Sequence, residues 1–181
     1  MNEARPARDP HSLALVGYRG TGKSTVGRIL ASRLGWTFHD TDTLLELTNP
    51  LPVALMFRQF GEPTFRDLES AIFSGLVEGP PRVVATGGGI VVRPENRRRL
   101  RSFGLVVWLT ADPGRIAGRI AEEAHLRPAL TAAGTLGEIA EVLEQRTPWY
   151  AEVADVAIAT DDLTPEEVAE AILEARGDRP C

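Results

Sequence analysis

The stretch from residue 17 to residue 25 constrains the fold of this chain more than any other. It reads GYRGTGKST, fits the pattern GxxxxGK[ST], and directly follows the apolar run 13–16. Glycines in such a pattern let the backbone turn its N–H groups inward onto phosphate oxygens, which a Cβ atom would block. We therefore predict a phosphate-binding loop between a strand and a helix. A glycine-rich turn that binds nothing is the alternative.

The residues of this loop have separate uses if it holds a nucleotide. Lys23 would reach the β- and γ-phosphates, and Ser24 would offer its hydroxyl to Mg²⁺. The helix that starts there would point its positive N-terminal end at the anion. Lys23 is the single lysine among 20 basic residues, at a place where a compact ammonium fits better than a planar guanidinium. The predicted ATP-binding residues of the loop are Gly20, Thr21, Gly22, Lys23, Ser24 and Thr25.

Short apolar segments alternate with helical segments along the chain. Strands are predicted at 13–16, 36–39, 82–85, 105–109 and 156–159. Helices are predicted at 23–34, around 44–47, at 53–60, 63–77 and 94–103, from 113, at 136–146, and from 165 to 176. This alternation predicts an α/β fold with three α/β/α layers around a five-stranded parallel sheet. We expect one domain over 11–181, after a flexible tail at 1–10, with a mobile lid at about 124–137.

Composition excludes several classes of protein. A net charge of −5 and a pI near 5.3 argue against a general partner for nucleic acid or a membrane surface, which would favour a basic face. No apolar run approaches the roughly 20 residues of a membrane span. The single cysteine, Cys181, excludes a disulfide within the chain and suits a reducing compartment. We therefore expect a cytoplasmic protein with a small-molecule substrate.

Polar and flexible residues follow the second and third predicted strands. In an open parallel sheet, ligands gather at the carboxyl ends of the strands, where this chain has Asp40-Thr41-Asp42 and Gly87-Gly88-Gly89. In extended backbone, Asp40 and Asp42 would project on the same side. Asp40 would then assist Mg²⁺, while Asp42 would orient an acceptor hydroxyl and take its proton. An acidic turn or helix cap is the alternative interpretation.

Three arginines supply candidate partners for an anionic substrate. Arg66 has Glu69 three residues later on a predicted helix, close enough to hold its guanidinium. Arg127 lies in the predicted lid, and Arg146 lies at the predicted end of a helix. Planar guanidinium groups bind carboxylates in a bidentate manner. The alternative is that each of these arginines is a solvated surface residue.

In combination, these motifs resemble the shikimate kinases. The resemblance rests on 17–25, Asp40-Thr41-Asp42, Phe65-Arg66 with Glu69, 86–89, Arg127-Pro128 and 146–150, and it covers about 13–176. It implies a fold like that of the nucleoside-monophosphate kinases and transfer of the ATP γ-phosphoryl group to the 3-hydroxyl of shikimate, a step towards chorismate and the aromatic amino acids. It also implies a monomer.

The same resemblance assigns roles residue by residue. Lys23, Asp42 and Arg127 would be catalytic, with Arg127 as the lid arginine. Asp42, Arg66, Gly88, Gly89 and Arg146 would bind shikimate, the two arginines through its carboxylate. Ser24 and Asp40 would serve Mg²⁺, and Arg119 would lie against the adenine. Phe57 and Phe65 would line the substrate pocket or belong to the core.

The chain departs from the family pattern at three places. They are Asn49-Pro50-Leu51-Pro52, Ala129 in the lid, and Trp149 before Tyr150, and none removes a charged or phosphate-binding group. Two other functions stay open on the sequence. A gluconate or nucleoside-monophosphate kinase would not need the Arg66 and Arg146 pair, and a non-enzymatic nucleotide-binding module would be expected to lack Asp42 or Lys23.

Overall fold

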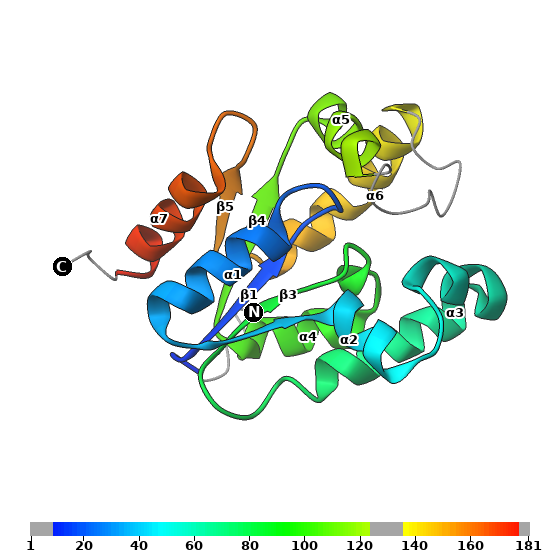
Figure 1. Cartoon of the computed structure of the whole chain (residues 1–181), viewed down its shortest axis with the longest axis horizontal. Helices are drawn as coiled ribbons and strands as arrows, with labels where there is room; N and C mark the ends of the chain where they lie inside the picture. The colour runs from blue at the N-terminus through cyan, green and yellow to red at the C-terminus, as the bar shows by residue number, and fades with distance from the viewer. Residues whose placement is uncertain (1–8, 124–135, 178–181) are drawn as a thin grey trace, which may run out of the picture.

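The computed structural model describes residues 9–123 and 136–177 (Figure 1). Most of the predicted tail at 1–10 and most of the predicted lid at 124–137, including Arg127 and Ala129, therefore lie outside the described residues.

A five-stranded parallel sheet forms the centre of the described part, as predicted. Its strands are β1 (Ser12–Val16), β2 (Thr37–Asp40), β3 (Arg82–Ala85), β4 (Leu105–Thr110) and β5 (Val156–Ala159), in the order β2-β3-β1-β4-β5. Asp40 is in register with Ala85, and Ala85 with Leu15. Strands β2, β3 and β1 therefore end at the same level, and the residues that follow them share one edge of the sheet.

One face of the sheet is covered by α1 (Lys23–Leu34) and α7 (Pro165–Arg176). Val26 and Leu30 of α1 pack with Val168 and Ile172 of α7 over the side chains of β1, β3 and β4, and all four helix residues are almost completely buried. Burying such side chains is the main favourable term in folding. A capping box begins α7, since Thr164 and Glu167 bond each other's backbone N–H groups.

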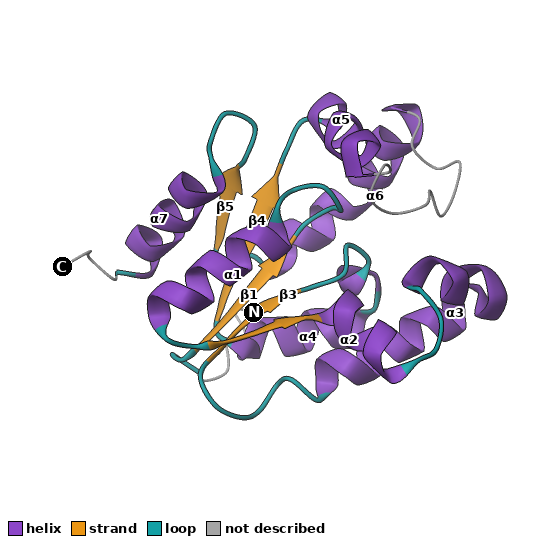
Figure 2. Cartoon of the chain, in the orientation of Figure 1, coloured by secondary structure: helices purple, strands orange, loops and turns teal. Residues whose placement is uncertain are grey.

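The opposite face is covered by α4 (Pro94–Phe103) and α6 (Leu136–Val153) (Figure 2). Leu100 and Phe103 of α4 and Tyr150 and Val153 of α6 pack on the side chains of β1, β3 and β4 that point to this side. Helices on both faces give the three layers that the sequence predicts. The short 3₁₀ helix η1 (Ile90–Val92) leads from β3 to α4, and α5 (Pro113–Glu123) follows β4.

The predicted end of α6 at residue 146 is wrong, because the helix continues to Val153. Pro148 lies inside it, and a proline there lacks one backbone N–H donor. Tyr150 and Val153 are nevertheless fully buried against the sheet, and this packing holds the helix together past the proline. Arg146 consequently lies within a helix and not at its end.

A smaller layer lies next to the β2 edge of the sheet (Figure 1). It consists of α2 (Thr41–Thr48) and α3 (Val53–Ser74), which share a cluster around Leu45, Met56 and Phe65. Gly61 interrupts α3 with a φ of 75° and a ψ of 164°, so the two helical segments predicted here are present as two halves of one element. No helix among 9–123 and 136–177 is long and apolar enough to span a bilayer.

Candidate active site

The phosphate loop runs from the end of β1 to the start of α1. Gly17, Gly20 and Gly22 have φ angles of 141°, 78° and 90°, which residues with a Cβ rarely adopt. A Cβ at Gly17 would also collide with the carbonyl oxygen of Leu109. Gly22 precedes the first turn of α1 and carries no side chain to cap it. The loop therefore has the geometry of an anion-binding strand-to-helix turn.

Lys23 lies against the loop and not in the solvent. Its side chain is 8% exposed, and its Nζ donates to the carbonyl oxygen of Tyr18 at 2.7 Å. The hydroxyl of Thr21 donates to the same carbonyl at 2.8 Å. The first bond holds the ammonium group against the loop, and the second fixes the carbonyl that it uses.

Asp40, the first residue of the acidic triplet, both caps a helix and contacts the phosphate loop. Asp40 ends β2 and caps α2, its Oδ1 accepting from the backbone N–H groups of Asp42 at 3.0 Å and Thr43 at 3.3 Å. Its Oδ2 accepts from the hydroxyl of Ser24 at 2.5 Å. Asp42 lies in the first turn of α2, so the prediction that the two aspartates share a side through extended backbone is wrong. The carboxylate of Asp40 therefore caps α2 with one oxygen and accepts from Ser24 of the phosphate loop with the other.

Asp42 lies in an environment that favours its protonated form. Burial raises the pKa of its carboxyl to about 6, with further upward contributions from the negative charges of Asp40 and Glu69, while Lys23 opposes them. A carboxylate in this state is ionised at neutral pH and is a stronger base than an ordinary aspartate. This combination suits a group that accepts a proton during a reaction.

Arg66 is a buried arginine with two acidic partners on its own helix. Its Nη1 donates to Glu69 at 2.9 Å and its Nη2 to Glu62 at 3.2 Å. The guanidinium carbon lies 5.8 Å from the ring centre of Phe57 and 5.3 Å from that of Phe65. The predicted contact between Arg66 and Glu69 is thus confirmed. Because Arg66 is 7% exposed, the alternative of a solvated surface arginine is wrong for it.

The glycine triplet after β3 connects three elements. The N–H of Gly87 donates to the hydroxyl of Thr41 at 2.8 Å, and the carbonyl of Gly88 accepts from Arg146 at 3.1 Å. A Cβ at Gly89 would overlap the guanidinium of Arg66, and a Cβ at Gly87 would lie 2.5 Å from the carboxylate of Glu69 and 2.7 Å from that of Asp42. The absence of side chains therefore lets α2 and α3 approach the triplet, while the Gly88 carbonyl joins it to α6.

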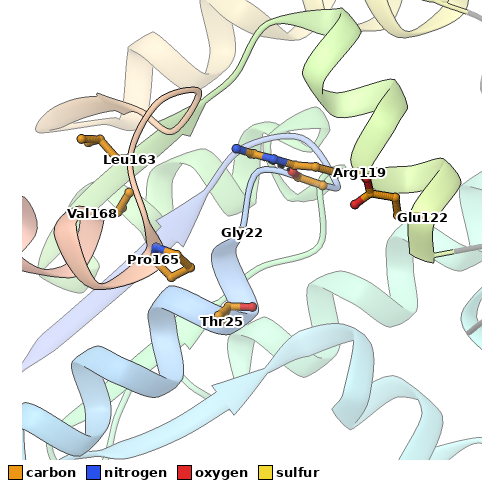
Figure 3. A pocket seen from close by; sticks show the side chains of 8 residues that line it. Gly22, Thr25, Arg119, Glu122, Leu163, Pro165 and Val168 are labelled. Carbon is orange, nitrogen blue, oxygen red and sulfur yellow. Dashed lines mark hydrogen bonds between the residues drawn. The ribbon is translucent and has the colours of Figure 1, made fainter.

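A pocket of about 440 Å³ opens beside the phosphate loop (Figure 3). Arg119 of α5 crosses its wall, bonded to the carbonyl of Gly20 at 3.2 Å and to the hydroxyl and carbonyl of Thr160 at 2.9 and 2.6 Å. The pocket is large enough for a small ligand group. Its lining consists of Gly20, Gly22, Thr25, Arg119, Glu122, Leu163, Pro165 and Val168.

The structure thus brings most of the predicted site residues to one edge of the sheet. Thr41, Glu62 and Tyr150, whose hydroxyl also donates to Gly88, contribute contacts that the sequence reasoning did not assign. Tyr150 follows Arg146 by four residues and shares its face only because α6 continues past the predicted end at 146. Thr41 lies between two predicted site residues, but no local pattern pairs it with Gly87.

Two of the three departures from the family pattern lie among the described residues, and both make contacts within the fold. Asn49 ends α2, with its backbone N–H bonded to the carbonyl of Leu45 at 3.0 Å, and Pro52 precedes α3. Trp149 lies under the guanidinium of Arg97, 5.5 Å from its ring centre. Neither of these contacts involves a predicted site residue.

A phosphate loop after β1, an acidic triplet after β2 and a buried arginine opposite define a P-loop kinase of the small-molecule type. The family model for shikimate kinase matches residues 19–176. The shikimate kinase of Symbiobacterium thermophilum is 41% identical over 172 residues, which cover 93% of this chain and 99% of that protein. The shikimate kinase of Thermodesulfovibrio yellowstonii is 39% identical over 162 residues, covering 90% and 92%. The chain belongs to the shikimate kinase family.

Solved structures agree with this assignment. The shikimate kinase from Acinetobacter baumannii in complex with shikimate superposes with a TM-score of 0.85 at 32% identity, covering 94% of this chain and 93% of that one. A gluconokinase from Sinorhizobium meliloti reaches a TM-score of 0.62 at 20% identity, covering 94% and 93%. This second likeness shows only the common fold.

Proposed function

We propose that this chain transfers the γ-phosphoryl group of ATP to the 3-hydroxyl of shikimate, yielding shikimate 3-phosphate and ADP. It would thus be a phosphotransferase with an alcohol group as acceptor. The observation that carries the proposal is the buried guanidinium of Arg66, fixed by Glu62 and Glu69 and in contact with Gly89. It offers a positive charge for an anionic acceptor.

The donor side of the reaction is assigned to the phosphate loop. Gly20, Thr21, Gly22, Lys23, Ser24 and Thr25 would hold the phosphates of ATP, because backbone N–H groups and one ammonium converge there. The 440 Å³ pocket borders the same glycines. It would take the adenine, with Arg119 against its face. Arg119 is suited to this because three hydrogen bonds to Gly20 and Thr160 fix its guanidinium.

Two oxygen ligands suit Mg²⁺ beside the loop. The hydroxyl of Ser24 and a carboxylate oxygen of Asp40 are 2.5 Å apart, and Mg²⁺ prefers hard oxygen ligands supplemented by phosphates and water. Ser24 and Asp40 would be the protein residues that hold the ion, in place of the hydrogen bond that now joins them. When bound, Mg²⁺ supplies positive charge that neutralises the phosphate oxygens.

On the acceptor side, Asp42 would orient the reacting hydroxyl and receive its proton. The hydroxyl oxygen forms a bond to the γ-phosphorus, the bond from that phosphorus to the oxygen bridging to the β-phosphate breaks, and ADP leaves with the electron pair. Lys23 stabilises the negative charge that develops on the phosphates. Arg127 lies outside the described residues, and we assign it a second positive charge near the transferring group.

The remaining assigned residues position shikimate. Arg66 and Arg146 would bind its carboxylate, and Gly88 and Gly89 would let it approach the backbone closely. The buried pair of Arg66 and Glu69 keeps the guanidinium in one orientation, so little side-chain entropy is lost on binding.

Shikimate-dependent release of ADP tests this function directly. Purified protein with ATP and Mg²⁺ should release ADP when shikimate is added, and gluconate or nucleoside monophosphates should not replace it. Turnover with gluconate or a nucleoside monophosphate, and not with shikimate, would reassign the substrate. Binding of ATP without turnover on any of these acceptors would favour a non-enzymatic nucleotide-binding module.

The proposal also includes three expectations from the sequence. They are a monomeric state, a location in the cytoplasm, and closure of a lid formed by about 124–137 over the bound substrates.

A further inference from the structure

Two side chains of α6 donate hydrogen bonds to one backbone carbonyl in the glycine triplet. The hydroxyl of Tyr150 donates to the oxygen of Gly88 at 2.5 Å, and Nη1 of Arg146 donates to the same oxygen at 3.1 Å. A carbonyl oxygen has two lone pairs and accepts both bonds. Tyr150 takes no part in the reaction proposed above, yet it shares an acceptor with Arg146.

The phenol of Tyr150 is held in place from several sides. The side chain is completely buried, and its ring stacks on Trp108 of β4 with ring centres 5.6 Å apart and an angle of 20° between the planes. Burial raises the pKa of the phenol to about 12, although Arg146 opposes this shift. The hydroxyl therefore stays protonated and stays aimed at Gly88 over the working pH range.

We propose that Tyr150 is a positioning residue that leaves Arg146 free to bind the substrate carboxylate. The inference rests on the function proposed above. Arg146 uses one of its N–H groups on the Gly88 carbonyl, and the Tyr150 hydroxyl keeps that carbonyl paired when Arg146 turns to the substrate anion. Without the Tyr150 hydroxyl, Arg146 is the only side chain among the described residues that still donates to the Gly88 carbonyl. If Arg146 then turned to the substrate carboxylate, the Gly88 carbonyl would have no side-chain donor. An unpaired buried carbonyl would lower the affinity for the substrate.

The test compares Tyr150→Phe with Ser102→Ala. The first variant removes the hydroxyl and keeps the ring that packs on Trp108. The control also removes one hydroxyl that donates to a backbone carbonyl, that of Arg99 at 3.0 Å, but near the end of α4 and just before β4, away from the site. KM and kcat are measured for shikimate and for its carboxamide, together with KM for ATP and the melting temperature.

For Tyr150→Phe, we expect KM for shikimate to rise about 3- to 10-fold, the effect of one lost hydrogen bond. Both kcat and KM for ATP should stay within about twofold. The carboxamide should lose much less, since it offers Arg146 no anion to bind. Ser102→Ala should leave all kinetic constants unchanged.

The outcomes separate this inference from the proposed function. Wild-type protein without shikimate-dependent turnover overturns both. If the wild-type protein turns over and Tyr150→Phe has an unchanged KM for shikimate, only the positioning role is overturned. Equal losses for shikimate and its carboxamide, or a fall in kcat alone, would likewise contradict an effect that acts through Arg146.

Discussion

The two sides of the site are built in different ways. The phosphate loop is one continuous segment, 17–25, and its geometry depends on glycine φ angles and on the start of α1. The acceptor side combines residues from α2, α3, the glycine triplet and α6, held together by contacts such as Thr41 to Gly87 and Arg146 to Gly88. A donor that many kinases share can be bound by local backbone, whereas selecting one acceptor requires side chains from distant parts of the chain.

This difference predicts that acceptor-side substitutions leave nucleotide binding intact. The largest effect is expected for Asp42→Asn, because the amide cannot accept the proton of the reacting hydroxyl. We expect kcat to fall about 10²- to 10⁴-fold, with an unchanged dissociation constant for ATP by calorimetry. Asp67→Asn, which removes a carboxylate paired with Arg93 outside the site, should keep its kcat. A weakened ATP affinity in Asp42→Asn would show that the two sides are not separable.

The next effect concerns the shape of the Arg66 side chain. Arg66→Lys keeps the charge and loses the planar fork that bonds Glu62 and Glu69. We expect KM for shikimate to rise roughly 10- to 100-fold, since hydrogen bonds between charged groups each contribute about 1.5–3 kcal/mol. Steady-state kinetics at saturating ATP measure it. Arg93→Lys, at a more exposed ion pair, serves as the control, and equal KM values for the two variants would count against the role of Arg66.

A third substitution tests the close approach of Gly89 to Arg66. In Gly89→Ala the new Cβ would overlap the guanidinium, and such overpacking typically costs about 1–3 kcal/mol. We expect a lower melting temperature and a KM for shikimate raised about tenfold, with ATP binding unchanged. Gly118→Ala of α5 has open space around its Cβ and should be stabilised by about 0.5–1 kcal/mol. A Gly89→Ala variant as stable and active as the wild type would contradict the claim that the acceptor side needs the close approach of Gly89 to Arg66.

The smallest effect is a pH dependence carried by Asp42. Burial and the nearby negative charges raise its pKa to about 6, so the carboxylate takes up a proton at a higher pH than an ordinary aspartate does. The protonated form cannot accept a proton, and kcat/KM for shikimate should therefore fall below pH 6, to about one tenth of its plateau at pH 5. Initial rates between pH 5 and 8 measure this limb. A profile that is flat down to pH 5 would argue against Asp42 as the base.

The sequence predicted those parts of the site that depend on near neighbours. The phosphate loop and the pair of Arg66 and Glu69 are each set by residues within a few positions of one another, and both are present. The assignment of Asp40 and Asp42 to one site stays a prediction, but the extended backbone expected for them is wrong, because Thr41 and Asp42 begin a helix that Asp40 caps. Local sequence rules therefore missed how the backbone presents these two side chains.

The end of α6 shows where local rules failed. Pro148 and the polar residues before it indicate a helix that stops at 146, and only the packing of Tyr150 and Val153 on the sheet carries it to Val153. This extension places Tyr150 one turn after Arg146, where both bond Gly88. The propensity of a short segment is a weak influence beside the burial of large side chains.

The sequence by itself determined the strand and helix order, the phosphate loop and the residue types of the site, because these follow from periodicity, glycine positions and spacings of three or four residues. Only the tertiary structure decided the strand order β2-β3-β1-β4-β5, the pocket beside Arg119, the raised pKa of Asp42 and the meeting of Gly88 with Arg146 and Tyr150. These features depend on charge, burial and contact between residues tens of positions apart. Residues so far apart in the chain come into contact only when the sheet assembles and helices cover its two faces.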